Sequence, residues 1–184
     1  MTWTIAGSLA VEPATARTDL LAEPVAKALA ALPEEAAARV GVAEIDPELA
    51  DTAAFCQMYG SPLTASANCV VVVGKRAGEE RFAACLVLAT ARADVNGVVR
   101  RRLDVRKASF APMDTAVALT GMAYGGITPL GLPDWPLLLD PAVAAAPELV
   151  VGSGLRASKL FIPGDVLAAL PNTETLDGLG RPVA

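Results

Sequence analysis

A glycine- and proline-rich segment constrains the fold more than any other feature of this sequence. Residues 121–133 contain four glycines and two prolines. Such a segment is costly to order, because glycine loses more conformational freedom on folding than any other residue. The pair Gly125 and Gly126 also allows positive φ angles and lets backbone amides approach a ligand closely. Two interpretations follow. The segment is either a plain tight turn or a loop whose shape serves to bind a ligand.

The residue types present exclude several kinds of chemistry. The chain has no histidine, which excludes Ser-His-Asp and Cys-His nucleophiles, histidine-bound zinc and an imidazole base. The glycine-rich segment lacks the endings of a P-loop and the spacing of a dinucleotide-binding loop. Asp134, Asp140 and the three cysteines show no metal-ligand spacing, so we expect no metal and no cofactor. Catalysis would have to use carboxylates, lysine, arginine, hydroxyls, thiols, water or backbone amides.

Length and composition indicate one folded domain. The 184 residues are 53% hydrophobic and carry a net charge of −5, enough to bury a core and too acidic for a general nucleic-acid binder. The cysteines form no C-x-x-C pair, which is typical of a reducing compartment. The N-terminus lacks signal-peptide features, and the longest apolar run, residues 82–89, is too short to span a bilayer. We expect a cytoplasmic protein with no membrane partner, a poorly structured arm over residues 1–18 and one domain over residues 19–184.

Hydrophobic patterning predicts a mixed α/β arrangement. The runs at residues 69–74 and 82–90 are expected to form a hairpin around a polar loop, residues 75–81. Neither run alternates strictly, so both strands should lie in a sheet covered on two faces. Helices are expected over residues 20–32, 46–59, 96–103 and 113–119 and after residue 164, and further strands over residues 37–45, 136–140, 149–152 and 159–162.

Four segments occur in a recognisable order: the apolar strand 69–74, the block LTGMAYGGITPLG at residues 119–131, LLLD at residues 137–140 and VGSG at residues 151–154. In this the chain resembles the YbaK/EbsC superfamily of aminoacyl-tRNA deacylases, relatives of the editing domain of prolyl-tRNA synthetases. The resemblance implies a mixed α/β domain with a curved, mostly antiparallel central sheet flanked by helices. It also implies a pocket between the glycine loop, residues 121–133, and the sheet, which receives the aminoacyl end of mischarged tRNA.

The resemblance assigns roles to residues of the glycine loop and of the later turn. The amides of Gly125 and Gly126 are expected to hold the ester carbonyl, and loss of one such donor typically lowers the rate by about 10²–10³. Gly121 and Pro129 are expected to shape the loop. The other substrate-binding candidates are Tyr124, Ile127, Gly152, Ser153, Gly154 and Lys159.

Two positions depart from the family pattern. The family hydrolases carry a lysine where this chain has Asn68, an amide that offers hydrogen bonds but no charge. The deacylases typically place an acidic residue where this chain has Lys159. We therefore hypothesise that the cation has moved from one strand to another, with a solvent-facing Lys159 as the alternative. Lys75, seven residues from Asn68 and so about 23 Å away along a strand, is a poor substitute.

One basic cluster occurs in the sequence. It either contacts the phosphates of a tRNA acceptor stem or forms a solvated helix face. With only eight aromatic residues in the chain, recognition of RNA by base stacking is not expected. The cluster consists of Arg100, Arg101, Arg102, Arg106 and Lys107.

Two functional hypotheses remain. The first is a free-standing deacylase that hydrolyses the ester of mischarged tRNA, with tRNA(Pro)-type substrates preferred and an aminoacyl-tRNA synthetase as an optional partner, and with no role on DNA. The VGSG turn lacks the histidine that the alanyl-specific editors and the inserted prolyl-synthetase domain carry there. In this respect the chain resembles the cysteinyl-tRNA(Pro) deacylase branch more closely. The second is a catalytically silent relative that binds an aminoacyl or nucleotide-like ligand or a partner protein, and Asn68 is the residue that divides the two.

Overall fold

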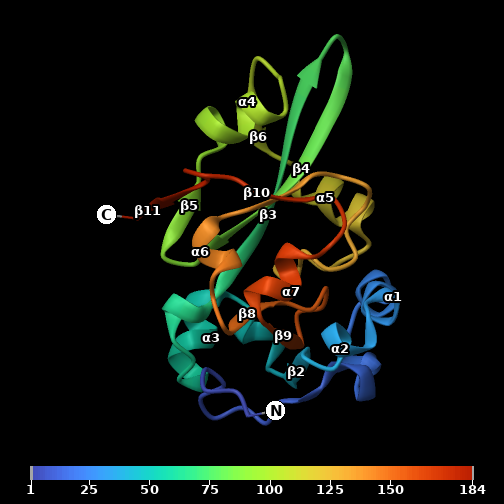
Figure 1. Ribbon diagram of the computed structural model, residues 1–184, viewed down its shortest axis with the longest axis vertical. Helices are drawn as coiled ribbons and strands as arrows, with labels where there is room; N and C mark the ends of the chain where they lie inside the picture. Colours follow the sequence, from blue (N-terminus) through green and yellow to red (C-terminus); the bar gives the residue numbers. More distant parts are fainter. Residues whose placement is uncertain (1, 184) are drawn as a thin grey trace.

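The chain folds around two main β-sheets, of four and five strands, which lie in the lower and upper parts of Figure 1. The computed structural model describes residues 2–183. Its strands are β1 (Glu12–Pro13), β2 (Gly41–Glu44), β3 (Ala67–Arg76), β4 (Glu79–Leu88), β5 (Ala91–Ala93), β6 (Ala108–Phe110), β7 (Leu137–Leu139), β8 (Leu149–Gly152), β9 (Ser158–Ile162), β10 (Thr173–Thr175) and β11 (Gly180–Pro182).

The strand order explains how the sheets are joined. One sheet has the order β1-β2-β9-β8, the second has the order β10-β7-β4-β3-β6, and β11 pairs with β5. A parallel bridge between Ser66 and Val150 links the beginning of β3 to β8. Within residues 2–183, β7 runs parallel to β4 and β10, and the other strand pairs are antiparallel. The predicted mixed α/β fold with a mostly antiparallel sheet is therefore confirmed.

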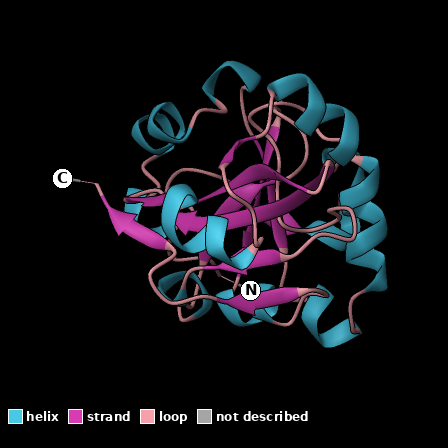
Figure 2. Cartoon of the chain, turned by 90° about the horizontal axis from the view of Figure 1, so that it is seen from above, coloured by secondary structure: helices cyan, strands magenta, loops and turns pink. Residues whose placement is uncertain are grey.

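Short helices surround the sheets (Figure 2). No helix among the described residues has the length and apolar character needed to cross a membrane. The α-helices are α1 (Glu23–Ala31), α2 (Glu34–Ala37), α3 (Thr52–Tyr59), α4 (Arg100–Arg102), α5 (Met113–Thr120), α6 (Pro141–Ala144) and α7 (Gly164–Ala168). The 3₁₀ helices are η1 (Ala14–Ala16), η2 (Thr18–Leu20), η3 (Pro47–Leu49) and η4 (Leu63–Ala65), and η5 (Val95–Val99) is a π-helix.

The β3–β4 hairpin is longer than the sequence predicted. Ala77 and Gly78 both have positive φ, 52° and 87°, and form a two-residue turn, so most of the expected loop at residues 75–81 is strand. Successive residues of β4 point into different cores, with Leu86 in one and Cys85 in the other. The prediction of a hairpin covered on both faces is confirmed.

Two other segments differ from expectation. Residues 37–40 are not part of a strand, because α2 extends to Ala37 and pairing begins at Gly41. The single helix predicted over residues 46–59 is divided, since Asp46 accepts a hydrogen bond from the N–H of Glu48 and Asp51 accepts one from that of Ala53. Each aspartate caps its own helical segment, which leaves Ala50 between η3 and α3.

The N-terminal residues pack on the sheet. Ile5 and Ala6 are buried beside Phe161, and the Trp3 ring lies 5.6 Å from the Phe161 ring. β1 pairs with β2. The expectation of a poorly structured arm is therefore wrong for residues 2–18.

Candidate functional site

A cavity of about 790 Å³ opens where the two sheets diverge. Ser66, the residue before β3, bridges to Val150 of β8, and β6 pairs with β3 from Val72 onward. Among the described residues, no strand pairs with the outer edge of residues 67–70, and these four residues line the cavity. The start of α3, the glycine loop, and parts of β8 and β9 form its other walls.

Three candidate positions, Asn68, Gly152 and Lys159, belong to strands that line the cavity, and we call this part of its lining the floor. Gly152 pairs with Lys159, and Asn68 lies two residues after Ser66, which forms a parallel bridge with Val150 of β8. Residues opposite one another on neighbouring strands point to the same face. All three residues line the cavity.

Lys159 is buried in the cavity wall, with 7% of its surface exposed. Its Nζ donates a hydrogen bond to the Ala50 carbonyl at 2.7 Å and lies 5.6 Å from the centre of the Phe55 ring. Burial lowers the pKa of Lys159 to about 8, although the nearby Asp51 carboxylate opposes the shift. The alternative of a solvent-facing lysine is therefore wrong.

Asn68 contacts the same segment as Lys159. Its Oδ1 accepts a hydrogen bond from Thr52 Oγ1 at 2.8 Å, and among residues 2–183 its Nδ2 has no hydrogen-bond partner. Ala50 and Thr52 thus connect the two positions that depart from the family pattern, through the break between η3 and α3. The Nδ2 donor of Asn68 remains available to a ligand.

The backbone of the glycine loop is locked to the turn after β8. The N–H of Gly126 donates to the Ala123 carbonyl at 2.9 Å, and the Gly126 carbonyl accepts from the N–H of Gly154 at 2.7 Å. A Cβ atom on Gly152 would lie 2.3 Å from the Gly126 carbonyl oxygen. The Gly126 amide is therefore used inside the loop and is not free to hold a carbonyl, contrary to the expectation.

Gly125 keeps the expected position. It has a φ of 83°, lines the cavity, and its N–H makes no hydrogen bond within the described part of the chain. Tyr124 and Ile127 also line the cavity. The predicted pair of carbonyl-binding amides is thereby reduced to the amide of Gly125.

The other predicted loop and turn residues do not line the cavity. Gly121 ends α5 with a φ of 66°, and Pro129 and Gly154 lie outside the cavity lining. Ser153 is fully buried, and its Oγ is 2.7 Å from that of Ser158. These residues help to position the cavity walls. Because they do not line the cavity, they are not placed to contact a substrate bound in it.

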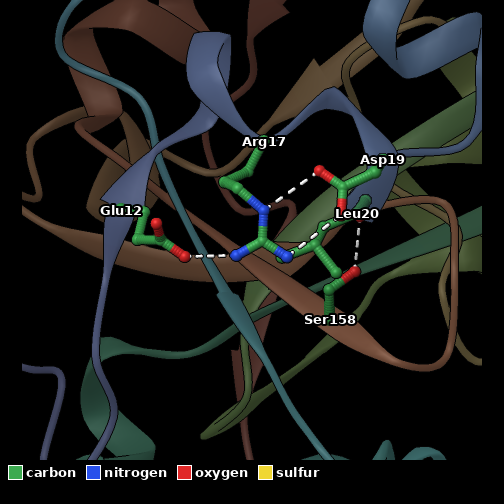
Figure 3. A network of polar contacts seen from close by, with 5 residues as sticks. All are labelled: Glu12, Arg17, Asp19, Leu20 and Ser158. Carbon is green, nitrogen blue, oxygen red and sulfur yellow. Dashed lines mark hydrogen bonds and ion pairs between the residues drawn. The ribbon is translucent and has the colours of Figure 1, made fainter.

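A polar network fixes the strand that carries Lys159 (Figure 3). The Oγ of Ser158 donates to the Leu20 carbonyl at 2.6 Å. Arg17 bonds both carboxylate oxygens of Asp19 and also Glu12. The N-terminal segment is thus tied to β9 directly beside Lys159.

Sequence reasoning missed two charged residues of the cavity, Arg156 and Asp51. The Arg156 guanidinium donates to the Tyr124 carbonyl at 3.2 Å and to the Pro47 carbonyl at 2.9 Å, which joins the glycine loop to η3. Asp51 lines the same wall. A signal for Arg156 was its place two residues after the VGSG turn, but no signal distinguished Asp51 from an ordinary helix cap.

Thiol chemistry is not supported at the cavity. Cys69 lines it, but burial raises the pKa of this thiol, so it is protonated at neutral pH and a poor nucleophile. Within residues 2–183 no group of three or more Cys, Asp or Glu side chains is placed to hold a metal ion.

The basic cluster is only partly assembled. Arg100, Arg106 and Lys107 line a second concavity of about 900 Å³ beside β3, together with Lys75 of the hairpin; we call these four residues the basic hollow. Arg102 is instead paired with Glu174. Arg101 does not line the hollow.

Comparisons with known proteins agree with this architecture. A structure described as a candidate trans-editing enzyme for prolyl tRNA synthetase has a TM-score of 0.67 and 22% identity, covering 85% of this chain and 98% of that one. A designed epitope scaffold has a TM-score of 0.69 and 22% identity, covering 89% and 100%. A hypothetical protein has a TM-score of 0.59 and 18% identity, covering 69% and 83%. These likenesses show a shared fold.

The sequence itself places the chain in a family. No curated protein sequence matches it significantly. The family model described as the aminoacyl-tRNA editing domain matches residues 46–170, a range that contains the glycine loop, Asn68 and Lys159. The chain therefore belongs to the aminoacyl-tRNA editing domain family.

Proposed function

We propose that this chain is a free-standing, cytoplasmic trans-editing deacylase that hydrolyses the ester of mischarged tRNA. Its family supports the reaction class, and the neighbour described as a candidate trans-editing enzyme for prolyl tRNA synthetase supports tRNA(Pro)-type substrates. The synthetase is then a candidate partner. The hydrolysis itself uses no cofactor.

The observation that carries the proposal is the buried amine of Lys159 in a cavity that also presents the Gly125 N–H and the Asn68 amide. An ester carbonyl gains negative charge on its oxygen as a nucleophile adds to its carbon. Donors held in place before the reaction stabilise that charge most in a partly desolvated site. Lys159, protonated below a pKa of about 8, supplies the positive charge that Asn68 lacks.

The proposed reaction is a direct hydrolysis. The oxygen of a water molecule adds to the ester carbonyl carbon, and the developing oxyanion faces the Gly125 amide and the Lys159 ammonium. The bond between this carbon and the ribose oxygen then breaks, and a proton originating from the water ends on the ribose oxygen. The products are the free amino acid and a tRNA with a free terminal hydroxyl.

The basic hollow is proposed to hold the acceptor stem. Val73 and Gly74 of β3 line the hollow, whereas residues 67–71 of the same strand line the cavity. Three strand residues cover about 10 Å, so phosphates in the hollow lie within a few nucleotides of an ester in the cavity. Lys75 joins this surface, and only Glu80, 3.5 Å from its Nζ, adds negative charge to the lining.

The test is deacylation of Ala-tRNA(Pro), Cys-tRNA(Pro) and a set of Ser-tRNAs by wild-type protein and by Lys159→Ala. Wild type should release amino acid above the buffer rate, and Lys159→Ala should lose about 10²–10³ of that rate, as when one oxyanion donor is removed. Lys27→Ala is the matched control, because this lysine is exposed and pairs with Glu23 on α1. Ligand binding without turnover on any substrate would instead support a silent binding module.

A further inference from the structure

The aromatic residues of this chain divide into two groups. Six of the eight are packed against one another as ring pairs with centroid distances of 5.0–5.6 Å. Phe110 and Tyr124 belong to no such pair, and each is 60% exposed. The paired rings are Trp3 with Phe161, Phe55 with Tyr59, and Phe82 with Trp135.

Both unpaired rings line the same cavity. Phe110 comes from the end of β6 and Tyr124 from the glycine loop. Leu63 and Met113, which are 43% and 51% exposed, line it as well. The cavity therefore has a polar floor, with Asn68 and Lys159, and an exposed apolar rim consisting of Leu63, Phe110, Met113 and Tyr124.

The backbones that carry the two rings are anchored. The N–H of Ala111, next to Phe110, donates to the Val71 carbonyl at 2.8 Å. The Tyr124 carbonyl accepts from Arg156. Because the backbone that carries these rings is already ordered, a ligand that binds to their flat apolar faces causes little further loss of conformational entropy.

Charge indicates which ligand these surfaces fit. Lys107, in the basic hollow, is three residues from Phe110, about 10 Å along β6. A positively charged surface that leads to unpaired aromatic rings is the arrangement with which proteins bind single-stranded nucleic acid, since phosphates contact the cations and bases stack on the rings. An apolar amino-acid side chain would leave the adjoining cations without a role, whereas a single-stranded nucleic acid uses both the rings and the cations.

We propose that Phe110 and Tyr124 stack on unpaired nucleobases at the 3′ end of the tRNA and so hold its terminal ester over Asn68 and Lys159. This inference rests on the proposed function, because the ligand is the end of the same substrate. It also reverses the expectation that eight aromatic residues are too few for base stacking. The tertiary structure brings Phe110 and Tyr124, the two aromatic residues that form no ring pair, to the mouth of the same cavity.

The experiment measures binding of a fluorescein-labelled RNA hairpin that ends in four unpaired nucleotides. A second hairpin has abasic residues at its last two positions and keeps every phosphate. Phe110→Ala and Tyr124→Ala should each weaken binding of the intact hairpin by about 5- to 100-fold, the range for one lost stacking contact. Tyr124→Phe should bind as wild type does, and Phe110→Leu should lose most of the affinity lost by Phe110→Ala.

The controls separate stacking from other effects. Met58→Ala, at a residue 59% exposed on α3 and outside the cavity lining, should leave binding unchanged. Wild type should bind the abasic hairpin more weakly than either alanine variant binds the intact one, because that hairpin loses both stacking contacts, and each variant should prefer the intact hairpin less than wild type does. Equal losses on both hairpins, wild-type affinity in the alanine variants, or no preference of wild type for the intact hairpin would overturn the proposal.

Hydrolysis is measured separately, so the two proposals fail in different ways. Base-dependent binding without deacylation would overturn the proposed function and leave the stacking surfaces in place. Deacylation with no difference between the hairpins would overturn the stacking proposal alone.

Discussion

Lys159 donates a 2.7 Å hydrogen bond from Nζ to the carbonyl oxygen of Ala50, the first of the two residues between η3 and α3. This bond exists because Asp46 and Asp51 cap separate helical segments. In one continuous helix the Ala50 carbonyl would accept a backbone N–H instead. The helix break and the buried lysine therefore belong to one arrangement.

Burial of Lys159 should destabilise the folded protein at neutral pH. Its pKa falls from 10.5 to about 8 on folding, so the folded state binds fewer protons than the unfolded state between these values. Stability should therefore rise as pH increases from 8 to 10.5, and below pH 8 the unfavourable contribution is fully present. Lys159→Met should raise the free energy of unfolding at pH 7 by about 1–3 kcal/mol.

Urea denaturation at pH 7 and pH 10 checks this prediction. The gain of Lys159→Met over wild type should shrink at pH 10, where the wild-type amine is neutral in the folded state. Lys27→Met, at an exposed position, should show no such pH-dependent difference. A Lys159→Met protein less stable than wild type at pH 7 would contradict it.

The rate of deacylation should depend on the same amine. If the ammonium form stabilises the oxyanion, the enzymatic rate should fall as pH rises through about 8, the pKa of Lys159. Rates from pH 6 to 9.5, corrected for hydrolysis in buffer alone, measure this. A rate that rises through pH 8 would instead indicate that neutral Lys159 accepts a proton.

A second lysine should replace the first if the cation has moved between strands. Asn68 and Lys159 both line the cavity floor. Asn68→Lys in a Lys159→Met background should therefore react at least 10-fold faster than Lys159→Met alone, because a positive charge near the oxyanion stabilises it. Asn68→Gln in that background is the control. Recovery by neither variant would argue against an exchange of positions.

The contact between Gly126 and Gly152 should be essential for the shape of the loop. A Cβ on Gly126 would lie 2.5 Å from the Leu155 carbonyl oxygen, and a Cβ on Gly152 would lie 2.3 Å from the Gly126 carbonyl oxygen. Either alanine variant should displace the loop and lower kcat/KM by about 10- to 100-fold, as expected for misplacement near 1 Å. Gly78→Ala is the comparison, since its Cβ would meet nothing within 4 Å and only the turn would be strained. Equal effects at all three glycines would show that general strain, not this contact, is responsible.

Binding through the basic hollow should be sensitive to salt. Arg106→Ala should weaken binding of tRNA and of unrelated RNA alike, and the slope of log K against log salt should become shallower by about 1. Arg39→Ala is the matched control, because this arginine is paired with Asp165 away from the hollow. Titrations between low and moderate salt measure the slope, and an unchanged slope for Arg106→Ala would exclude a phosphate contact.

Local patterns were sufficient for most of the fold. The hairpin, the helix ended by Gly60 and the three apolar strands of the second half were predicted because turn residues and hydrophobic runs act over a few positions. The errors came where neighbours in space decided the outcome. Residues 2–18 looked weakly patterned, yet Trp3 and Ile5 find their apolar partners on β9 and in the core beside it.

The structure places some of the predicted site residues at the cavity and others away from it. The ordered motifs identified the glycine loop, and with it Gly125, as well as Asn68 and Lys159. Hydrogen bonding could not be read from them, so the Gly126 amide was assigned to substrate although it closes a turn on Ala123. Arg156 was missed because its bonds to Tyr124 and Pro47 join segments far apart in the chain.

By itself, the sequence determined the family, the mixed α/β class and the absence of imidazole chemistry, since residue types and short-range order decide these properties. The tertiary structure alone decided which groups face the cavity and in what state of charge. Lys159 has a lowered pKa because distant segments exclude water from it, and Phe110 and Tyr124 share a rim because β6 and the glycine loop meet there. Both properties depend on long-range packing, which no local pattern encodes.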